Sequence, residues 1–417
     1  MSVYVVNGSK RLGGEVEVQG SKNSALPILA ASVLTRGENV FFKCPSLSDV
    51  DVALRIIRSL GGKAQFSGGA LLVDCDDIHS NRVPDALTRE TRASVIFLGA
   101  LLGRAGRAVL GLPGGCELGA RPIDLHLRAL RLMGADIRER GGVLECSAGD
   151  GLRGADISLS FPSVGATENI ILAAVTADGT TTITNAAREP EVLDLCDYLC
   201  SAGAKIYGAG EGKLVIDGVS RLSAVTHTII PDRIVAATLM SAAAVTGSDI
   251  TLKGVIPSHL SAINSVFEEM GCNIYCDGAD MRFAAPGRLS RIEVVRTMPY
   301  PGFPTDAQAP LTAAAAVADG TSVFVENIFE NRYKHVSELN RLGADIKLQD
   351  RVAVISGVRR LYGARVRACD LRGAAALCCA ALAAEGESVI SGIRYLERGY
   401  ENFELVLSSL GADVKKI

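Results

Sequence analysis

The sequence predicts an α/β protein of two domains, each built from three copies of one repeat unit. Three observations lead to this prediction: a glycine-ended helical segment that recurs six times, a second family of almost wholly apolar helices, and a length of 417 residues, which is too long for one ordinary core. Hydrophobic residues make up 48% of the chain and aromatic residues only 5%. We therefore expect aliphatic cores that are rich in alanine.

The recurring segment reads as an amphipathic helix that ends in Leu-Gly-Ala or a close variant, followed by an alternating strand. Its glycines stand at positions 61, 134, 203, 271, 343 and 411, between 68 and 73 residues apart. A glycine directly after a helix is the expected left-handed C-cap. Self-similarity at a fixed period indicates repeated copies of one supersecondary unit.

The second family of helices alternates with the first and is apolar on nearly every face. We expect these helices at residues 25–34, 93–102, 166–176, 234–245, 309–317 and 373–384, each followed by a glycine and a short β-branched strand. A helix that is apolar all round must be buried on every side. Three such helices can fill one core, so six units predict two domains of three units each.

The N-terminal ends of the buried helices carry cations, although the helix dipole is positive there and repels them. These cations are Lys22, Arg92, Arg233 and Arg372. We interpret them, together with the free amides of the helix ends, as groups that bind an anionic ligand. Polar residues at the same ends could equally be plain N-caps, namely Ser163, Thr305 and Asp370.

Cys116 lies in the segment 112–124, whose three glycines and two prolines exclude a regular helix or strand. We expect its thiol on a loop, where Arg121 and loop amides would favour the thiolate. From the residues alone, a reactive cysteine and a small hydrophobe in a tight turn both remain possible.

Composition excludes several classes of protein. The net charge of −3 argues against a nucleic-acid-binding protein, and no apolar run is long enough for a membrane span. The N-terminal residues lack the pattern of a signal peptide, and the eleven cysteines contain no C-x-x-C pair for zinc or redox work. We therefore expect a protein of the reducing cytoplasm, without a metal.

Six motifs together resemble the enolpyruvyl transferases, in particular the branch that acts on UDP-N-acetylglucosamine. They occupy residues 21–27, 113–124, 185–191, 304–309, 329–332 and 398–401, and the resemblance covers essentially the whole chain. It implies a two-domain inside-out α/β barrel with six βαβαββ repeats, three per domain, around buried helices. It also implies domains at 22–229 and at 1–21 plus 230–417, with the active site in the cleft between them.

The resemblance implies a reaction in which the enolpyruvyl group of phosphoenolpyruvate moves to the 3-hydroxyl of UDP-N-acetylglucosamine. Phosphate is released by addition and elimination through a tetrahedral intermediate, in the first committed step of peptidoglycan synthesis. No cofactor is implied, so cationic side chains and helix ends would neutralise the substrates. We expect small-molecule substrates as the only partners, with no nucleic acid and no membrane. The oligomeric state stays open, and a monomer would suffice for the site.

By resemblance, Cys116 donates a proton to the methylene carbon and can carry a covalent adduct derived from pyruvate. The same position is the target of fosfomycin in the family, so we expect sensitivity to that drug. Asp306 accepts the proton of the sugar hydroxyl or orients that hydroxyl. Lys22, Arg121 and Arg398 would hold the phosphate of phosphoenolpyruvate.

The resemblance also implies the groups that bind the rest of the substrates. Arg332 and Arg372 would hold the carboxylate of phosphoenolpyruvate, Arg92 would line the site, and Asn23 would contact the intermediate. The uridine would lie on Arg121, Pro122, Ile123, Asp124 and Leu125. The diphosphate would meet Ser163, Val164 and Gly165, with Ile328 near the sugar. Four carboxylates would fix the arginines or be merely structural, namely Glu189, Asp232, Glu330 and Asp370.

Two positions depart from the family pattern. Ser48 and Phe161 stand where lysines are frequent, and losing two cations should weaken binding of the nucleotide sugar unless neighbours such as Lys43 compensate. Three alternatives therefore stay open: a paralogue with altered catalysis, a sensor that binds nucleotide sugars, and an enzyme of the shikimate type. The cysteine loop and the uridine motif argue against the last of these.

Overall fold

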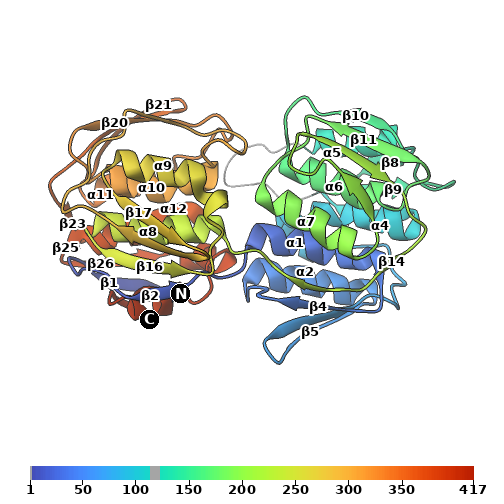
Figure 1. Ribbon diagram of the computed structural model, residues 1–417, viewed down its shortest axis with the longest axis horizontal. Coiled ribbons are helices and arrows are strands. Elements are labelled where there is room, and N and C mark those ends of the chain that lie inside the picture. Colours follow the sequence, from blue (N-terminus) through green and yellow to red (C-terminus); the bar gives the residue numbers. More distant parts are fainter. Residues whose placement is uncertain (1, 113–122) are drawn as a thin grey trace. The chain divides into compact units, whose positions relative to one another are not determined.

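The computed structural model describes residues 2–112 and 123–417, which form two compact units (Figure 1). The continuous unit comprises residues 20–112 and 123–230, and the discontinuous unit comprises residues 2–19 together with Pro231–Ile417. The chain thus passes from one unit to the other after Gln19 and again after Ile230. The boundaries that the sequence indicated lie after residues 21 and 229.

Three mostly apolar helices lie at the centre of each unit. In the continuous unit they are α1 (Lys22–Ala31) with the 3₁₀ turn η1 (Ser32–Leu34), α4 (Phe97–Ala105) with the preceding turn η2 (Arg92–Ile96), and α6 (Val164–Ala174). In the discontinuous unit they are α8 (Arg233–Val245), α10 (Thr305–Ala315) and α12 (Leu371–Ala383), which pack against one another. Several begin a few residues before the apolar pattern does, because polar and charged residues form their first turns.

The amphipathic helices cover the outside of the central ones. They are α2 (Ser48–Leu60), α5 (Asp124–Leu132), α7 (Pro190–Ser201), α9 (Ser261–Glu269), α11 (Val336–Arg341) and α13 (Phe403–Ser409), and a short extra helix, α3 (Asp85–Glu90), precedes η2. The six glycines that end the repeated segment have φ angles between 88° and 110°. This left-handed conformation confirms the predicted C-caps.

Each unit contains three small sheets of one pattern, in which the strand after a buried helix pairs antiparallel with a hairpin strand and parallel with an edge strand. In the continuous unit the sheet orders are β15 (Thr226–Thr228), β4 (Glu38–Phe42), β6 (Ala70–Asp74), β5 (Lys63–Ser67); β10 (Asp156–Ser158), β11 (Thr180–Thr184), β13 (Lys213–Asp217), β12 (Lys205–Tyr207); and β7 (Arg107–Gly111), β9 (Val143–Ser147), β8 (Asp136–Arg140). In the last sheet the parallel edge is reduced to one bridge between Arg82 and Val109. A two-stranded ribbon joins β14 (Leu222–Ser223) to β3 (Thr35–Arg36).

The discontinuous unit repeats this pattern. Its sheet orders are β17 (Asn273–Asp277), β18 (Asp280–Ala284), β16 (Asp249–Lys253), β2 (Glu15–Glu17); β19 (Val294–Arg296), β20 (Thr321–Val325), β22 (Val352–Ser356), β21 (Asp345–Gln349); and β24 (Arg365–Arg367), β26 (Glu387–Ser391), β1 (Tyr4–Asn7), β27 (Asp413–Lys416). A two-stranded ribbon joins β23 (Leu361–Tyr362) to β25 (Ala384–Glu385).

Each unit is closed by a strand from a distant part of the sequence. In the continuous unit β15, from the end of the unit, pairs with β4 near its beginning, with Thr226 opposite Val40. In the discontinuous unit β1 lies between β26 and β27, so Tyr4 pairs with both Ile390 and Lys416. With these closures each unit holds three βαβαββ repeats around its buried helices, which confirms the predicted fold class.

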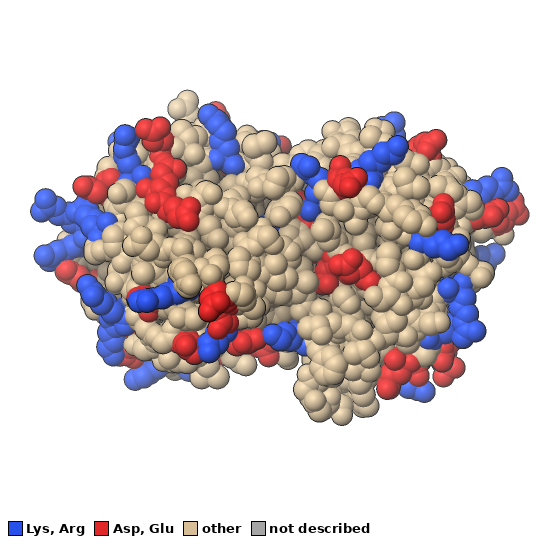
Figure 2. Space-filling model, in the orientation of Figure 1, with Lys and Arg blue, Asp and Glu red and all other residues tan. Residues whose placement is uncertain are grey.

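Each unit buries an apolar core of its own. Within residues 2–112 and 123–417, no helix has both the length and the apolar character that crossing a membrane would need. Figure 2 shows acidic and basic side chains interspersed on the face that is drawn. The four cations that the sequence predicted at the buried helices do lie at helix starts: Lys22, Arg92 and Arg233 are the first residues of α1, η2 and α8, and Arg372 is the second residue of α12.

Candidate active site

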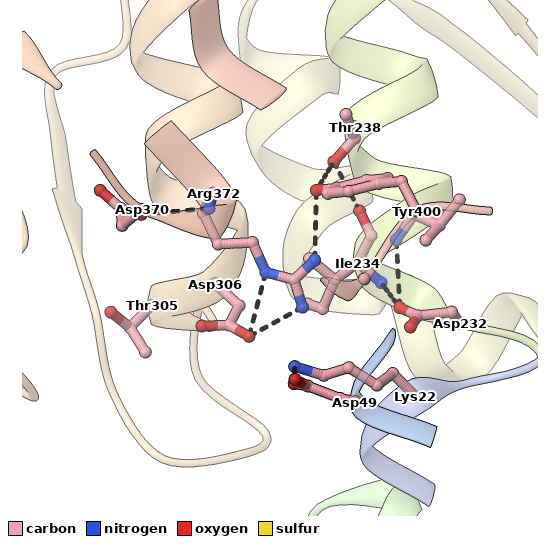
Figure 3. A network of polar contacts seen from close by, with 12 residues as sticks. Lys22, Asp49, Asp232, Ile234, Thr238, Thr305, Asp306, Asp370, Arg372 and Tyr400 are labelled. Carbon is pink, nitrogen blue, oxygen red and sulfur yellow. Dashed lines mark hydrogen bonds and ion pairs between the residues drawn. The ribbon is translucent and has the colours of Figure 1, made fainter. Parts of the chain in front are cut away.

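A carboxylate held between two buried guanidinium groups is the centre of the site in the discontinuous unit. Figure 3 shows this carboxylate, Asp306, with one of the two groups, Arg372. Oδ1 of Asp306 accepts a hydrogen bond from Nη2 of Arg332 at 2.7 Å, and Oδ2 accepts from Nη2 and Nε of Arg372 at 2.9 and 3.2 Å. Both arginine side chains are only 2% exposed, whereas the carboxylate is 28% exposed. The sequence predicted all three residues as functional, and the fold brings them together.

Helix ends place these three side chains. Asp306 is the second residue of α10 and Arg372 the second residue of α12, and these two helices pack side by side. Arg332 comes from the segment between β20 and α11, and its guanidinium also donates to the backbone oxygen of Thr305 at 3.0 and 3.3 Å. The first turn of α10 is therefore fixed by both its side chain and its backbone.

Arg372 is held by a third helix through Tyr400. Nη1 of Arg372 donates to the Tyr400 hydroxyl at 3.1 Å, and the guanidinium carbon lies 5.5 Å from the centre of the ring. The same hydroxyl lies 2.8 Å from Oγ1 of Thr238, which donates to the backbone oxygen of Ile234 in α8 (Figure 3). Sequence reasoning missed Tyr400 and Thr238 as partners, although Tyr400 belongs to the motif at 398–401.

Electrostatics keeps Arg372 charged although it is buried. Burial by itself would lower the pKa of its guanidinium, but Asp306, Tyr400 and Asp232 outweigh that effect and raise the pKa above the ordinary value. Burial raises the pKa of Tyr400, and the neighbouring Arg372 opposes this shift. A buried cation of this kind is stable only with such anionic and polar partners.

Asp232 and Asp370 serve as N-caps, which was one of the two roles the sequence left open for Asp370. Oδ1 of Asp232 accepts from the amides of Ile234 and Val235 at 2.8 and 3.1 Å. Oδ1 of Asp370 accepts from the amides of Arg372 and Gly373 at 3.1 and 2.9 Å. Asp370 therefore fixes the backbone from which the Arg372 side chain starts.

Thr305 is not an N-cap, because Pro304 holds that position and Thr305 is the first residue of α10. Its hydroxyl donates to Oε2 of Glu326 at 2.9 Å. Glu326 is fully buried, and its Oε1 accepts from the amides of Ile328 and Phe329 at 2.8 and 3.0 Å. It thus ties the predicted sugar-binding residue Ile328 to the first turn of α10. Sequence reasoning missed Glu326; an acidic residue directly after a β-branched strand was the available signal.

Glu330 makes a surface ion pair. The sequence left two roles open for it, to fix a substrate-binding arginine or to be merely structural. Its Oε1 lies 3.3 Å from Nη2 of Arg351, and both side chains are about half exposed, which favours the structural role.

In the continuous unit, Lys22 begins α1 and its Nζ lies 3.4 Å from Oδ2 of Asp49 in α2 (Figure 3). The two side chains are 12% and 5% exposed. Asn23 is the next residue of α1. Ser48, the departure from the family pattern, is the first residue of α2 and so directly precedes Asp49, which sequence reasoning had not singled out.

The other predicted residues of the continuous unit lie at helix ends. Ser163 caps α6, with its hydroxyl accepting from the amide of Ala166 at 3.3 Å, and Val164 and Gly165 begin that helix. A side chain at Gly165 would come within 3.2 Å of the His126 ring, which explains the glycine. Three further residues are placed as follows: Ile123 is buried in the core, Asp124 begins α5, and Leu125 packs on the core.

Arg92 is the first residue of η2, and Arg398 is the last residue of the 3₁₀ turn η4 (Ile393–Arg398). Phe161 is 43% exposed on the segment before α6. Cys116, Arg121 and Pro122 lie outside the described residues. Among the residues that are described, no three His, Cys, Asp or Glu side chains form a group that could hold a metal ion.

A cluster of carboxylates lies near the start of α7. Glu189 occupies the N-cap position of α7, Glu191 is buried, and Glu168 in α6 is 3% exposed. Burial, together with Glu191 and Glu189, raises the pKa of Glu168 well above its ordinary value. Glu168 was not predicted, since in sequence it stands between two other polar residues, Thr167 and Asn169, with no signal that sets it apart.

This architecture is that of the enolpyruvyl transferases. The family described as EPSP synthase (3-phosphoshikimate 1-carboxyvinyltransferase) matches residues 6–407, and the chain belongs to that family. The crystal structure of the enolpyruvyl transferase NikO from Streptomyces tendae is similar with a TM-score of 0.90 and 26% identity, over 100% of this chain and 98% of that one. An EPSP synthase from Acinetobacter baumannii, 21% identical with a TM-score of 0.76 over 100% of this chain and 99% of that one, shows the same fold.

Curated relatives within the family carry one name. UDP-N-acetylglucosamine 1-carboxyvinyltransferase 2 of Caldanaerobacter subterraneus subsp. tengcongensis is 47% identical over the whole of both chains. UDP-N-acetylglucosamine 1-carboxyvinyltransferase 1 of Carboxydothermus hydrogenoformans is 49% identical over 100% of this chain and 99% of its own. The predicted family is therefore confirmed.

Proposed function

We propose that the protein transfers the enolpyruvyl group of phosphoenolpyruvate to the 3-hydroxyl of UDP-N-acetylglucosamine and releases phosphate. Relatives named for this activity match the full chain at 47–49% identity. Within the structure, the observation that carries the proposal is the Asp306 carboxylate between the buried guanidinium groups of Arg332 and Arg372. This arrangement combines a group that can accept a hydroxyl proton with two groups that can bind a carboxylate.

Arg332 and Arg372 are suited to the carboxylate of phosphoenolpyruvate. Their contacts to Asp306 have the lengths of charge-assisted hydrogen bonds to a carboxylate, and Arg372 presents both Nε and Nη2 to one oxygen. Because the site is water-poor at these side chains, such contacts are stronger than in bulk solvent. Tyr400 and Asp370 hold Arg372 in place from the side chain and the backbone.

The proposed reaction proceeds by addition and then elimination. In the addition, Cys116 gives a proton to the methylene carbon of phosphoenolpyruvate, the sugar oxygen bonds to its central carbon, and Asp306 takes the hydroxyl proton. In the elimination, the Cys116 thiolate takes back a proton from the new methyl group, the bond between the central carbon and the phosphate oxygen breaks, phosphate leaves, and the carbon–carbon double bond is restored. Lys22, Arg121 and Arg398 would bind the phosphate, with Asp49 holding Lys22.

The remaining predicted contacts form part of the same proposal. Arg92 and Asn23 would line the phosphoenolpyruvate site, and Ile328 would contact the sugar. The uridine and diphosphate would be held by the residues 121–125 and 163–165. No metal or organic cofactor takes part, so a chelator should leave turnover unchanged. We place the protein in the cytoplasm, in peptidoglycan synthesis, with fosfomycin alkylating Cys116.

A phosphate-release assay tests the proposal. Phosphoenolpyruvate is supplied with UDP-N-acetylglucosamine, and shikimate 3-phosphate replaces the nucleotide sugar in the control. Turnover with the nucleotide sugar alone supports the proposal, and turnover with shikimate 3-phosphate alone would identify the shikimate-type enzyme instead. Binding of the nucleotide sugar without phosphate release, measured by calorimetry, would indicate a sensor.

A further inference from the structure

A buried carboxylate in the continuous unit lies outside all the motifs considered so far. Asp194 in α7 has a side chain that is 4% exposed. Its Oδ2 accepts hydrogen bonds from the hydroxyl of Ser24 and, at 3.3 Å, from the amide of Ile230, while its Oδ1 lies 2.9 Å from Nε2 of His227. An ion buried in this way is tolerated only when its oxygens are satisfied, so these three groups and the carboxylate fix one another.

The three partners of Asp194 come from separate segments. Ser24 lies in the first turn of α1, directly after Lys22 and Asn23, and His227 lies in β15. Ile230 is the last residue of the continuous unit before the chain enters the other unit. Its backbone oxygen accepts from the amide of Ser21 at 2.7 Å, so the two ends of the unit are joined at this point.

The first turn of α1 depends on these contacts of Asp194 and Ile230, because it lacks the usual hydrogen bond from its own N-cap side chain. Ser21 occupies the N-cap position, but its side chain makes no capping hydrogen bond, and its buried hydroxyl has no partner among the described residues. The helices α6, α8 and α12 are capped by their own N-cap side chains, as described above. In α1 the start of the helix is restrained from outside instead: Asp194 accepts from the Ser24 hydroxyl, and the backbone oxygen of Ile230 accepts from the amide of Ser21.

We propose that Asp194 is a positioning residue for phosphoenolpyruvate binding: through Ser24 and Ile230 it holds the end of α1 that presents Lys22 and Asn23. This inference rests on the proposed function, in which these two residues meet the substrate. Lysine is a flexible point charge, so the accuracy of its placement depends on the backbone that carries it. The Asp49 contact restrains the far end of the Lys22 side chain, and Asp194 restrains its base.

Three variants and one matched control test the inference. Asp194→Asn keeps the shape of the side chain but removes the charge, Ser24→Ala removes only the contact to α1, and the third variant combines both. Asp197→Asn is the control, because Asp197 is an exposed acidic residue one turn further along the same helix. For each protein we would measure kcat, the KM of each substrate, phosphoenolpyruvate binding by calorimetry, and urea unfolding by circular dichroism.

We expect Asp194→Asn to raise the KM and the Kd of phosphoenolpyruvate about tenfold. A change of this size corresponds to the loss of one charge-assisted hydrogen bond. The KM of the nucleotide sugar should stay within about twofold, and Asp197→Asn should match the wild type. The double variant should be no worse than Asp194→Asn, because both changes break the same link.

Two results would overturn the inference. The first is that Asp194→Asn binds phosphoenolpyruvate within about twofold of the wild type and lowers only the midpoint of urea unfolding. Such a result would mark Asp194 as a purely structural residue. The other is additive losses in the double variant. If Asp194→Asn fails to fold, Ser24→Ala alone decides the question through the same affinity. Wild-type protein that does not turn over would refute the proposed function instead, and calorimetry with phosphoenolpyruvate would still test the positioning.

Discussion

Replacing Asp306 by asparagine should separate stability, catalysis and substrate binding in the discontinuous unit. The change removes a carboxylate that contacts both Arg332 and Arg372, at 2.7 and 2.9 Å. Removing one partner of a buried ion pair costs about 3–5 kcal/mol. Since the carboxylate itself is 28% exposed and water can partly replace it, we expect the free energy of unfolding to fall by about 3 kcal/mol, the lower end of that range.

The kinetic effect of Asp306→Asn should differ from its effect on binding. If Asp306 accepts the hydroxyl proton, kcat should fall by about two to four orders of magnitude, which is the usual contribution of a general base. Phosphoenolpyruvate affinity should be unchanged or higher, because Asp306 occupies the same guanidinium groups that the substrate carboxylate would use. A general loss of folding would lower the fraction of active protein without tightening binding.

Urea unfolding followed by circular dichroism, together with phosphate-release kinetics, would measure these effects; the chain contains no tryptophan to serve as a fluorescent probe. Asp319→Asn is the matched control, because Asp319 is 77% exposed and pairs with the partly exposed Arg288 at 3.1 Å in the same unit. This surface pair should contribute less than about 1 kcal/mol. Unchanged kcat in Asp306→Asn would refute the catalytic role, and unchanged stability would refute the ion-pair geometry.

Three further predictions concern other described or motif residues. Tyr400→Phe leaves Nη1 of Arg372 without its acceptor, so unfolding should become about 1–3 kcal/mol easier and phosphoenolpyruvate should bind more weakly; wild-type values in calorimetry and urea unfolding would contradict this. Because the pKa of Glu168 is raised in the folded protein, the unfolded chain loses this proton from about pH 4.3 upward while the folded protein still keeps it. The free energy of unfolding of the wild type should therefore fall as the pH rises from there, and Glu168→Gln should flatten the decline. An equal dependence of stability on pH in the two proteins between about pH 4.5 and 7.5 would count against this. With nucleotide sugar present, fosfomycin should add to Cys116 and not to Cys369, because burial and nearby carboxylates raise the pKa of the Cys369 thiol; peptide mass spectrometry that finds Cys116 unmodified would disprove this.

Much of the fold could be predicted because its signals are local. The glycines after the amphipathic helices and the apolar runs of the buried helices are properties of consecutive residues, and the structure confirms both. The closure of each unit could not be predicted from the same patterns. β15 and β1 complete repeats whose other strands lie far away in sequence, and a short strand carries no signal that names its partner.

The residues of the candidate site also divide into those with a local signal in the sequence and those without one. Arg332, Arg372 and Asp306 were predicted from motifs, but their ion pairs join residues that are 26 and 66 positions apart. The role of Glu330 stayed open in the sequence for the same reason, since a motif fixes a residue type and not the partner of its side chain. Glu326, Asp49 and Asp194 were missed, because in sequence each is an ordinary acidic residue.

The sequence by itself determined the repeat, the buried helices and the cations at their ends, since helix periodicity and glycine caps act within a few residues. Only the tertiary structure decided which carboxylate meets which cation. That choice follows from the packing of α8, α10 and α12 around one another and of the segment between η4 and α13 against them, which brings Asp306 and Tyr400 to Arg372. A buried charge needs partners in every direction at once, and partners from separate helices are set by packing rather than by spacing along the chain.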